Sequence, residues 1–342
     1  MIICIFFDIL DIEFMKAIVT GGAGFIGSHL VDLLMRKKHQ VIVLDNLSTG
    51  KKENIKKWLS HSNFSFYKTD ISNYQKIKKY FKGVDWVFHL AGKAEIVPSI
   101  NDPLSYFQTN VLGTISVLEA SRKENIKKFI YAASSSCYGL AKTFPTPEDA
   151  PINPEYPYAL TKYLGEVLCL YYYKIYKLPV ISLRLFNVYG PRVRASNSYG
   201  AMFPTFLAQK INGYPMTIVG DGKQKRDFVF VKDVVQAFLK AAQSKISGEI
   251  FNVGSGKPYS INYIVKLLKG DYIYIPKRPG EPDCTWADIK KIKKKLKWHP
   301  KVSLKEGIKI MLKNINDYKD LPLWTQEKIK EATKEWFYYL KK

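Results

Sequence analysis

Three glycines at three-residue spacing, Gly21, Gly24 and Gly27, constrain this chain more than any other feature. They lie between the apolar run Lys16–Thr20, which predicts a strand, and the stretch Phe25–Lys37, which has helical periodicity. In a strand-to-helix turn such glycines permit a tight bend, let the backbone approach a pyrophosphate, and let the helix pack on the strand. The helix N-terminus then presents N–H groups to the phosphates. The turn therefore indicates a dinucleotide site, with a tight turn that binds nothing as the alternative.

An aspartate, Asp45, follows the next apolar run, Gln40–Leu44. A carboxylate at the end of this second strand can accept hydrogen bonds from both ribose hydroxyls of an adenosine, and it repels a 2′-phosphate. The nearby Lys51 and Lys52 lie a few positions too far along the chain to reverse that preference. We therefore predict NAD, rather than NADP, as the cofactor.

Strand and helix patterns alternate through the first half of the chain. This alternation predicts an α/β fold with a doubly wound parallel sheet of the Rossmann type. Further strands are expected at Phe64–Lys68, Trp86–Leu90, Phe129–Ala133 and Val180–Leu185, and helices at Tyr74–Phe81, Leu104–Lys123 and Tyr158–Tyr176.

The alternation ends after Asn187, where Pro, Gly, Asn and Ser become frequent. We expect residues 15–187 to form the NAD-binding domain and residues 188–342 to form a smaller, mainly substrate-binding region that is interwoven with it. Within that region the patterns predict helices at Val231–Ala242, Ile261–Leu268 and Trp324–Leu340, and a strand at Ile250–Val253.

A tyrosine and a lysine, Tyr158 and Lys162, are four residues apart and share one face of a predicted helix. A lysine ammonium beside a phenol lowers the pKa of the phenol, so the tyrosine can act as a general base toward a hydroxyl. The same spacing recurs elsewhere in the chain, and position distinguishes this pair. It follows the serine cluster Ser134–Ser136, which stands where the fifth strand ends and where such sheets bind ligands. An ordinary serine-rich turn followed by an amphipathic helix is the alternative.

The formal net charge of +23 raises the possibility of nucleic-acid binding. The excess is nearly all lysine spread along the chain, whereas base readout and phosphate clamping favour arginine. We therefore expect no nucleic-acid partner. We expect no membrane partner either, because no later segment is long and apolar enough to cross a bilayer. A positive field would instead attract an anionic nucleotide substrate.

The four cysteines show no pairing or metal-ligand spacing, and the histidines form no ligand pattern, so we predict no metal site and a reducing cytoplasm. The apolar segment 1–14 carries three acidic residues and lacks the basic start and cleavage site of a signal peptide. It is also too short to span a membrane. We interpret it as a loose extension or a mis-assigned start.

The chain resembles the extended short-chain dehydrogenase/reductases of the nucleotide-sugar epimerase/dehydratase type. The resemblance spans about residues 15–340 and rests on ordered motifs, which are Thr20–Ser28, Asp45–Gly50, His89–Gly92, Asn110, Ser134–Gly139, the Tyr158/Lys162 pair, Leu183–Pro191, Arg226–Phe228 and Arg278–Glu281.

The resemblance implies roles for particular residues. Ser134, Tyr158 and Lys162 would be catalytic, with Tyr158 as the base. Contacts to NAD would come from Gly21, Gly24, Phe25, Ile26, Gly27, Asp45, Asn46, Ser48, Thr49, Gly50, Asp70, Ile71, Leu90, Ala91, Gly92, Asn110, Tyr158, Lys162 and Phe186. The nucleotide sugar would be bound by Ser134, Ser135, Ser136, Asn187, Arg226, Arg278, Glu281 and Thr285.

The resemblance also separates two reactions. A 4,6-dehydratase normally has Asp and Glu directly after the catalytic Ser or Thr, and here those positions are Ser135 and Ser136. The serine string is similar to that of the UDP-hexose and UDP-N-acetylhexosamine 4-epimerases. Thr285 stands where a tyrosine restricts the C2 substituent in UDP-galactose epimerases. We therefore expect a 4-epimerase that acts through a 4-keto intermediate, with a 4,6-dehydratase as the alternative.

Two other classes remain as alternatives from the residues. A net oxidoreductase would exchange NAD(H) with solvent, and a nucleic-acid-binding module would exploit the charge.

The resemblance further implies a homodimer through a face formed by Leu104–Lys123 and Tyr158–Tyr176.

Overall fold

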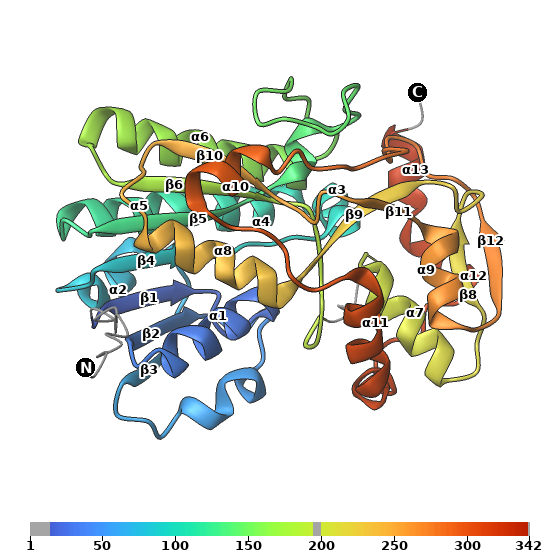
Figure 1. The fold of residues 1–342 in the computed structure, drawn as a ribbon, viewed down its shortest axis with the longest axis horizontal. Helices are drawn as coiled ribbons and strands as arrows, with labels where there is room; N and C mark the ends of the chain where they lie inside the picture. Colours follow the sequence, from blue (N-terminus) through green and yellow to red (C-terminus); the bar gives the residue numbers. More distant parts are fainter. Residues whose placement is uncertain (1–13, 194–199, 341–342) are drawn as a thin grey trace, which may run out of the picture.

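The computed structural model describes residues 14–193 and 200–340, and within them a seven-stranded parallel sheet has the order β10-β6-β5-β4-β1-β2-β3 (Figure 1). The predicted α/β fold of the Rossmann type is confirmed. The strands are β1 (Lys16–Thr20), β2 (Gln40–Asp45), β3 (Phe64–Lys68), β4 (Trp86–His89), β5 (Lys128–Ser134), β6 (Val180–Leu185) and β10 (Glu249–Val253). The interpretation of residues 1–14 concerns a segment that lies, apart from Phe14, outside the described residues.

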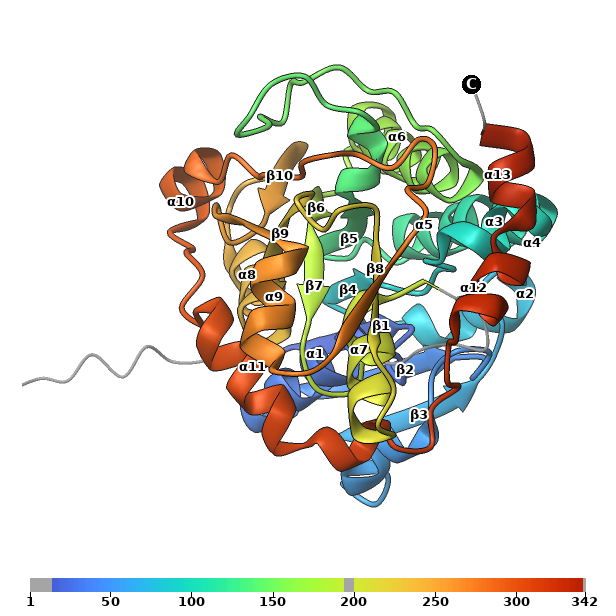
Figure 2. The same cartoon turned by 90° about the vertical axis from the view of Figure 1, so that its right-hand side faces the viewer.

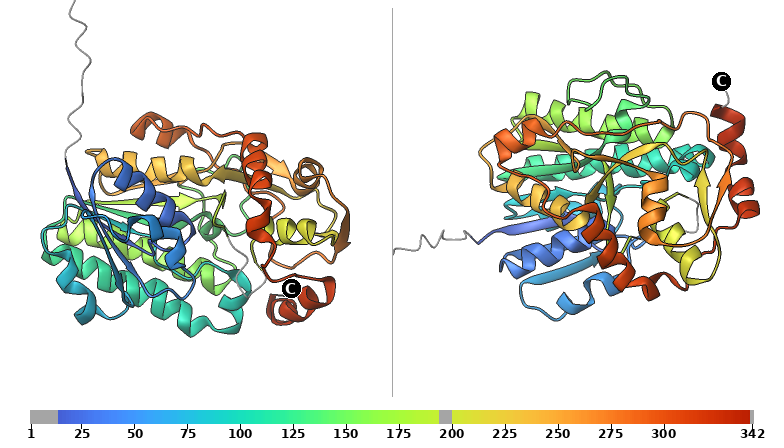
Figure 3. Two further views of the ribbon diagram at one scale, coloured as in Figure 1. Left: turned by 90° about the horizontal axis from the view of Figure 1, so that it is seen from below. Right: turned by 45° about the vertical axis from the view of Figure 1, so that its right-hand side comes forward.

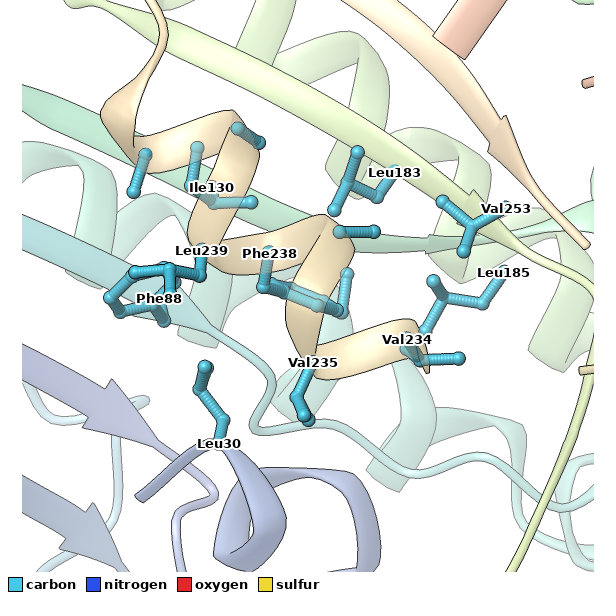
Figure 4. Packing of buried hydrophobic residues seen from close by; sticks show 14 of the residues in the cluster. Leu30, Phe88, Ile130, Leu183, Leu185, Val234, Val235, Phe238, Leu239 and Val253 are labelled. Atoms are coloured by element: carbon cyan, nitrogen blue, oxygen red, sulfur yellow. The ribbon is translucent and has the colours of Figure 1, made fainter. Parts of the chain in front are cut away.

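Helices cover both faces of this sheet (Figure 3). On one face, α1 (Phe25–Arg36) and α8 (Val231–Gln243) bury their apolar stripes. Figure 4 shows Phe238 and Leu239 of α8 packed near Phe88 of β4 and Ile130 of β5. The opposite face is covered by α2 (Tyr74–Ile77), α5 (Gly113–Lys123) and α6 (Pro157–Tyr176). Because both faces are covered, the strands are apolar on both sides.

The remaining elements build a second region around its own apolar cluster. Strand β9 (Lys225–Phe230) pairs with β7 (Asn187–Tyr189) and β11 (Pro258–Ser260), while β8 (Met216–Val219) pairs with β12 (Tyr272–Ile275). The helices of this region are α7 (Met202–Ile211), α9 (Ile261–Leu268), α11 (Leu304–Lys313), α12 (Gln326–Ala332) and α13 (Lys334–Leu340). Helix α10 (Lys290–Leu296) packs instead against β10 and α8 and buries Ile292 and Leu296 in the core of the first sheet. Strand β10 and helix α8 follow residue 187 in the sequence but belong to the first sheet and the layer that covers it. The domain division at residue 187 stays a prediction.

Two predicted helices are interrupted. The stretch Leu104–Lys123 contains α4 (Pro103–Phe107), a π-helical turn at Gln108–Leu112 and then α5. The predicted helix Trp324–Leu340 is wrong as one element, because it divides into α12 and α13 at Thr333. At Thr333 the backbone has φ −102° and ψ 7°, outside helical values, while the hydroxyl and the N–H of this residue both donate to the carbonyl of Ile329.

The shorter elements complete the chain. They are α3 (Ile96–Asn101) and the 3₁₀ turns Lys52–Trp58, Lys78–Phe81, Ser135–Tyr138 and Ile315–Tyr318. Within the described ranges, no helix combines the length and apolar character that crossing a bilayer requires.

Candidate active site

The glycine turn joins β1 to α1 and forms a bare backbone cradle. Gly21 has a φ of 69°, and a Cβ atom added there would lie 2.7 Å from the backbone nitrogen of Ala91. A Cβ atom on Gly27 would collide with the carbonyl oxygen of Gly21. The first bond of the helix runs from the N–H of Ser28 to the carbonyl of Gly24, so the preceding N–H groups of the helix point out of its end. Such a cradle fits a dinucleotide pyrophosphate.

Asp45 is buried beside this cradle at the end of β2. Its carboxylate accepts hydrogen bonds from the backbone N–H groups of Ala23 at 2.9 Å and Leu47 at 2.8 Å. Burial raises the pKa of Asp45, and these two hydrogen bonds oppose the rise. A Cβ atom on Gly50 would lie 2.9 Å from this carboxylate, so the loop Asn46–Gly50, which contains Ser48 and Thr49, folds closely around it. Each carboxylate oxygen keeps capacity for a further donor, such as a ribose hydroxyl.

The end of β3 lies against the same loop. The Asn46 side chain donates to Asp70 at 3.5 Å, and the N–H and hydroxyl of Ser72 donate to the other Asp70 oxygen at 2.8 Å. Although partial burial opposes it, the bonds from Ser72 lower the pKa of Asp70. Ile71 is buried against Gly113, where a Cβ atom would leave it no room. Asp70 and Ile71 therefore lie beside the loop that surrounds Asp45, and their contacts to NAD stay a prediction.

Asn110 anchors the loop that follows β4. Its side chain exchanges hydrogen bonds with the backbone of Lys93 at 2.8 and 3.0 Å, and it donates to the Thr161 hydroxyl of α6 at 3.0 Å. The backbone N–H groups of Leu90 and Ala91 bond the Thr20 hydroxyl. The π-helical turn places the Asn110 amide at this crossing, a distortion that often marks functional sites.

The proposed reacting groups meet at the end of β5. The Tyr158 hydroxyl donates to the Ser134 hydroxyl at 3.1 Å, and the Ser134 and Ser136 hydroxyls lie 2.8 Å apart. Ser134 also accepts from the backbone N–H of Ser136 at 3.2 Å, which closes the 3₁₀ turn that contains Ser135. A strand end, a tight turn and a helix therefore bring three hydroxyl groups together, as the sequence predicted.

Lys162 lies one helical turn beyond Tyr158 and is buried. Its ammonium lies 4.4 Å from the centroid of the Tyr131 ring. Burial lowers the pKa of Lys162 to about 8. Burial also raises the pKa of Tyr158, against the effect of its hydrogen bonds to Ser134 and Ser136. In the chain without its ligands the pKa of Tyr158 is therefore raised, and the lowering that the spacing to Lys162 predicted is not seen.

The expected substrate residues gather at the junction of the two regions. Arg226 pairs with Glu281 at 3.1 Å, and Arg278 lies 4.0 Å from the same carboxylate. Arg226 and Glu281 line a cavity of about 450 Å³, and Arg278 and Glu281 line a second one of about 700 Å³. The two cationic side chains thus flank one carboxylate beside open space, an arrangement suited to an anionic ligand.

Thr285 is held in a fixed orientation near this junction. Its hydroxyl donates to the side-chain oxygen of Asn187 at 2.9 Å and accepts from the backbone N–H of Asp227 at 3.2 Å. Phe186, which precedes Asn187, is buried, and its backbone N–H bonds the carbonyl of Val253. The structure therefore joins Asn187 and Thr285, which are far apart in the sequence.

Sequence reasoning missed a buried ion pair below the serine turn. Arg184 of β6 bonds both carboxylate oxygens of Glu166 of α6 at 2.6–3.1 Å, and it also donates to the Tyr138 hydroxyl at 2.8 Å. Both partners of the pair are at most 3% exposed. A signal existed, because Glu166 continues the four-residue spacing of Tyr158 and Lys162 along one helix face. The pair supports the turn from which the serines project.

Tyr156 and Trp336 were also missed. Their ring centroids lie 6.2 Å apart, and the Tyr156 ring is stacked with Tyr158 at 6.3 Å. No local pattern links Trp336 to the site, since it comes from the C-terminal helix. Over the described residues, no group of three or more potential ligands among His, Cys, Asp and Glu could hold a metal ion.

Comparison with known proteins places this geometry in a family. The profile of the NAD dependent epimerase/dehydratase family matches residues 17–254. The UDP-glucose 4-epimerase of Mycolicibacterium smegmatis is 36% identical over 303 residues, covering 86% of this chain and 96% of that protein.

Two solved structures are also similar. The UDP-N-acetylglucosamine 4-epimerase of Methanobrevibacter ruminantium, in complex with UDP-N-acetylmuramic acid, has a TM-score of 0.82 at 35% identity, over 88% of this chain and 99% of that one. The UDP-glucuronic acid 4-epimerase of Bacillus cereus, in complex with UDP-glucuronic acid and NAD, has a TM-score of 0.83 at 35% identity, over 89% and 99%. These matches confirm the expected family and its cofactor, NAD. The chain belongs to the NAD-dependent epimerase/dehydratase family.

Proposed function

We propose that this protein is an NAD-dependent UDP-sugar 4-epimerase. The observation that carries the proposal is the hydroxyl cluster of Ser134, Ser136 and Tyr158 at the end of β5. One tyrosine beside two serines can take a proton from a sugar hydroxyl and return it. The similar 4-epimerases named above act on different UDP-sugars but all invert carbon 4, which supports this reaction.

In the proposed mechanism, Tyr158 removes the proton of the sugar 4-hydroxyl, while Ser134 donates a hydrogen bond to the oxygen that becomes a ketone. The chemistry that NAD supplies when bound is reversible hydride transfer at carbon 4, and its positive nicotinamide favours an ionised tyrosine nearby. Lys162 adds a buried positive charge on the same side of the helix. Turning the ketone in the pocket and returning proton and hydride to its opposite face inverts carbon 4.

The nucleotide stays fixed while the sugar turns. Arg226 and Arg278 would bind the diphosphate as bidentate donors, and Glu281, which pairs with both, would release them to the phosphates and accept ribose hydroxyls. The glycine cradle and Asp45 would hold NAD on the other side of the sugar. The chain would thus have separate binding sites for its two nucleotide ligands, NAD and the UDP-sugar.

A 4,6-dehydratase is disfavoured by the same turn. Elimination of water needs an acid for the leaving hydroxyl and a base for the proton at carbon 5. The turn offers only the hydroxyls of Ser135 and Ser136 at the positions where those carboxylates are expected. Incubation of the purified enzyme with a panel of UDP-sugars, without added NAD, tests the proposal. We expect NMR to show the 4-epimer, whereas a 4-keto-6-deoxy product would contradict it.

Threonine at position 285 is smaller than the tyrosine that restricts the C2 substituent in UDP-galactose epimerases, so a C2 acetamido group would fit beside it. Both UDP-hexoses and UDP-N-acetylhexosamines are therefore proposed substrates. Thr285→Tyr should lower the ratio of kcat/KM for UDP-N-acetylglucosamine to that for UDP-glucose by about a hundredfold, because the larger ring fills the space. Competition assays with the two substrates measure the ratio directly, and Thr285→Ser is the matched control. An unchanged ratio in Thr285→Tyr would place the acetamido group elsewhere.

We also propose a cytoplasmic homodimer. Exposed apolar side chains gather on α4, the π-helical turn and α6, where Leu104 is 80% exposed, Leu112 54%, Val167 41% and Tyr171 52%. Monomers rarely leave such a group uncovered. The cysteines Cys137, Cys169 and Cys284 are free, which suits a reducing compartment.

Charge on this face should dissociate the dimer. The double variant Val167→Glu, Tyr171→Glu is expected to run as a monomer in light-scattering measurements at micromolar concentration, because its α6 face would bring carboxylates together without partners. Tyr214→Glu, at a 49% exposed tyrosine outside the face, is the control and should stay dimeric. A monomeric wild-type protein, or a double variant that stays dimeric, would refute this interface.

A further inference from the structure

The C-terminal helices α12 and α13 lie between the sheet domain and the second region. Ile329 of α12 packs with Trp324 and Ile275, in the region that contains β12. Helix α13 lies beside α3, which belongs to the sheet domain (Figure 2). With its side-chain nitrogen directed toward α13, the Asn101 amide of α3 donates to the Glu335 carboxylate at 3.0 Å. This segment therefore contacts both the sheet domain and the second region.

Trp336 is the buried residue through which α13 reaches the site, with 2% of its surface exposed. Its indole N–H donates to the backbone carbonyl of Pro279 at 2.7 Å, which fixes the ring beneath the Arg278 loop. The Arg278 guanidinium lies 5.5 Å from the centroid of that ring. A guanidinium above an indole is attracted to the face of the ring and keeps its N–H edges available for an anion.

Trp336 also contacts the tyrosine beside the catalytic base. Its ring lies 6.2 Å from Tyr156, and Tyr156 is nearly parallel to Tyr158, with an interplanar angle of 8°. In addition, Phe337 and Arg278 line the same cavity of about 700 Å³. One helix turn thus contacts the anion-binding arginine, the tyrosine stack and the cavity wall.

We propose that Trp336 is a positioning residue for substrate binding: it holds the Arg278 guanidinium so that its N–H edges face the nucleotide diphosphate. The proposal rests on the proposed function for the identity of the ligand. It makes the C-terminal helix a built part of the nucleotide site. Glu281 is shared between the two arginines, with Arg226 at 3.1 Å and Arg278 at 4.0 Å.

The test compares Trp336→Leu, Trp336→Phe and the control Tyr339→Ala, which removes a 65% exposed ring from the same helix. Calorimetry gives the Kd of UDP, steady-state kinetics give KM and kcat, and bound NAD reports on the distant cofactor site. For Trp336→Leu we expect Kd and KM to rise about tenfold, with kcat within about threefold and NAD content unchanged. Trp336→Phe keeps a ring face and should recover part of the loss, and Tyr339→Ala should match wild type.

A merely structural role makes different predictions. It would lower the melting temperature and NAD content together, and Trp336→Phe would be no better than Trp336→Leu; either result overturns the proposal. A Kd and KM of wild-type size in folded Trp336→Leu would also overturn it.

Should Trp336→Leu fail to fold, a cycle of Arg278→Lys and Trp336→Phe provides the test, since lysine keeps the charge but loses the planar stack. Non-additive effects on the Kd of UDP support the proposal, and additive ones refute it. A wild-type protein that binds UDP but turns over no UDP-sugar refutes the proposed reaction alone, because UDP binding still reports on Trp336.

Discussion

Tyr158→Phe is expected to lower kcat for UDP-sugar epimerisation by about a thousandfold, because general acid–base catalysis contributes about that much to proton transfers. The variant keeps the ring that stacks on Tyr156 and loses only the hydroxyl that bonds Ser134. It should therefore fold, retain NAD and bind UDP like wild type. Coupled spectrophotometric assays of the purified variant measure the loss.

Tyr163→Phe is the matched control, since it makes the same change on the same helix at a tyrosine that packs against the apolar core. Its kcat should stay within about threefold of wild type. Full turnover by Tyr158→Phe would remove Tyr158 from the role of base, and a loss of NAD in that variant would assign the effect to the cofactor site.

Glu166→Gln is expected to destabilise the protein by about 3 kcal/mol, because it leaves the Arg184 charge buried without its partner. The ion pair is nearly inaccessible, and the Arg184 guanidinium also bonds the Tyr138 hydroxyl and the backbone carbonyl of Glu148. Hydrogen bonds to Glu166 raise the pKa of Arg184 in spite of burial, so the arginine stays charged at any accessible pH. Urea unfolding followed by tryptophan fluorescence gives the change in unfolding free energy.

Ser182→Ala provides the comparison for this second prediction. It removes the neutral hydroxyl that donates to Glu166 at 2.8 Å and leaves the ion pair in place, so it should cost about 1 kcal/mol. Equal effects of the two substitutions would show that the charge pair adds nothing beyond a single hydrogen bond. Because Tyr138 belongs to the serine turn, Glu166→Gln should also lower activity at temperatures where the fold survives.

Local patterns predicted the parts of the site that lie within one structural unit. The turn from Gly21 to Gly27 and the pair Tyr158 and Lys162 each lie within one strand–turn–helix or one helix turn, where spacing determines geometry. The end of β5 could be placed beside them because parallel strands end at one edge of the sheet.

The rest depends on contacts between distant segments. The Asn110 amide reaches Lys93 and Thr161 only because the helix widens into a π turn, which no residue pattern announces. The break comes at Thr333, where the backbone leaves helical angles with φ −102° and ψ 7°, within a stretch whose periodicity is helical. Trp336 reaches Arg278 across 57 intervening sequence positions through the fold of the second region, as its bond to Pro279 shows. Sequence periodicity identifies elements, whereas such contacts arise from packing.

In the proposed reaction, a hydride leaves carbon 4 of a UDP-sugar and returns to the same carbon. The most direct test is incubation with UDP-glucose that carries deuterium at carbon 4, without added NAD, followed by mass spectrometry and NMR of the product. We predict UDP-galactose of unchanged mass with the deuterium still at carbon 4. A product that has lost water and carries the deuterium at carbon 6, or one that has lost the label to free cofactor, would contradict the account.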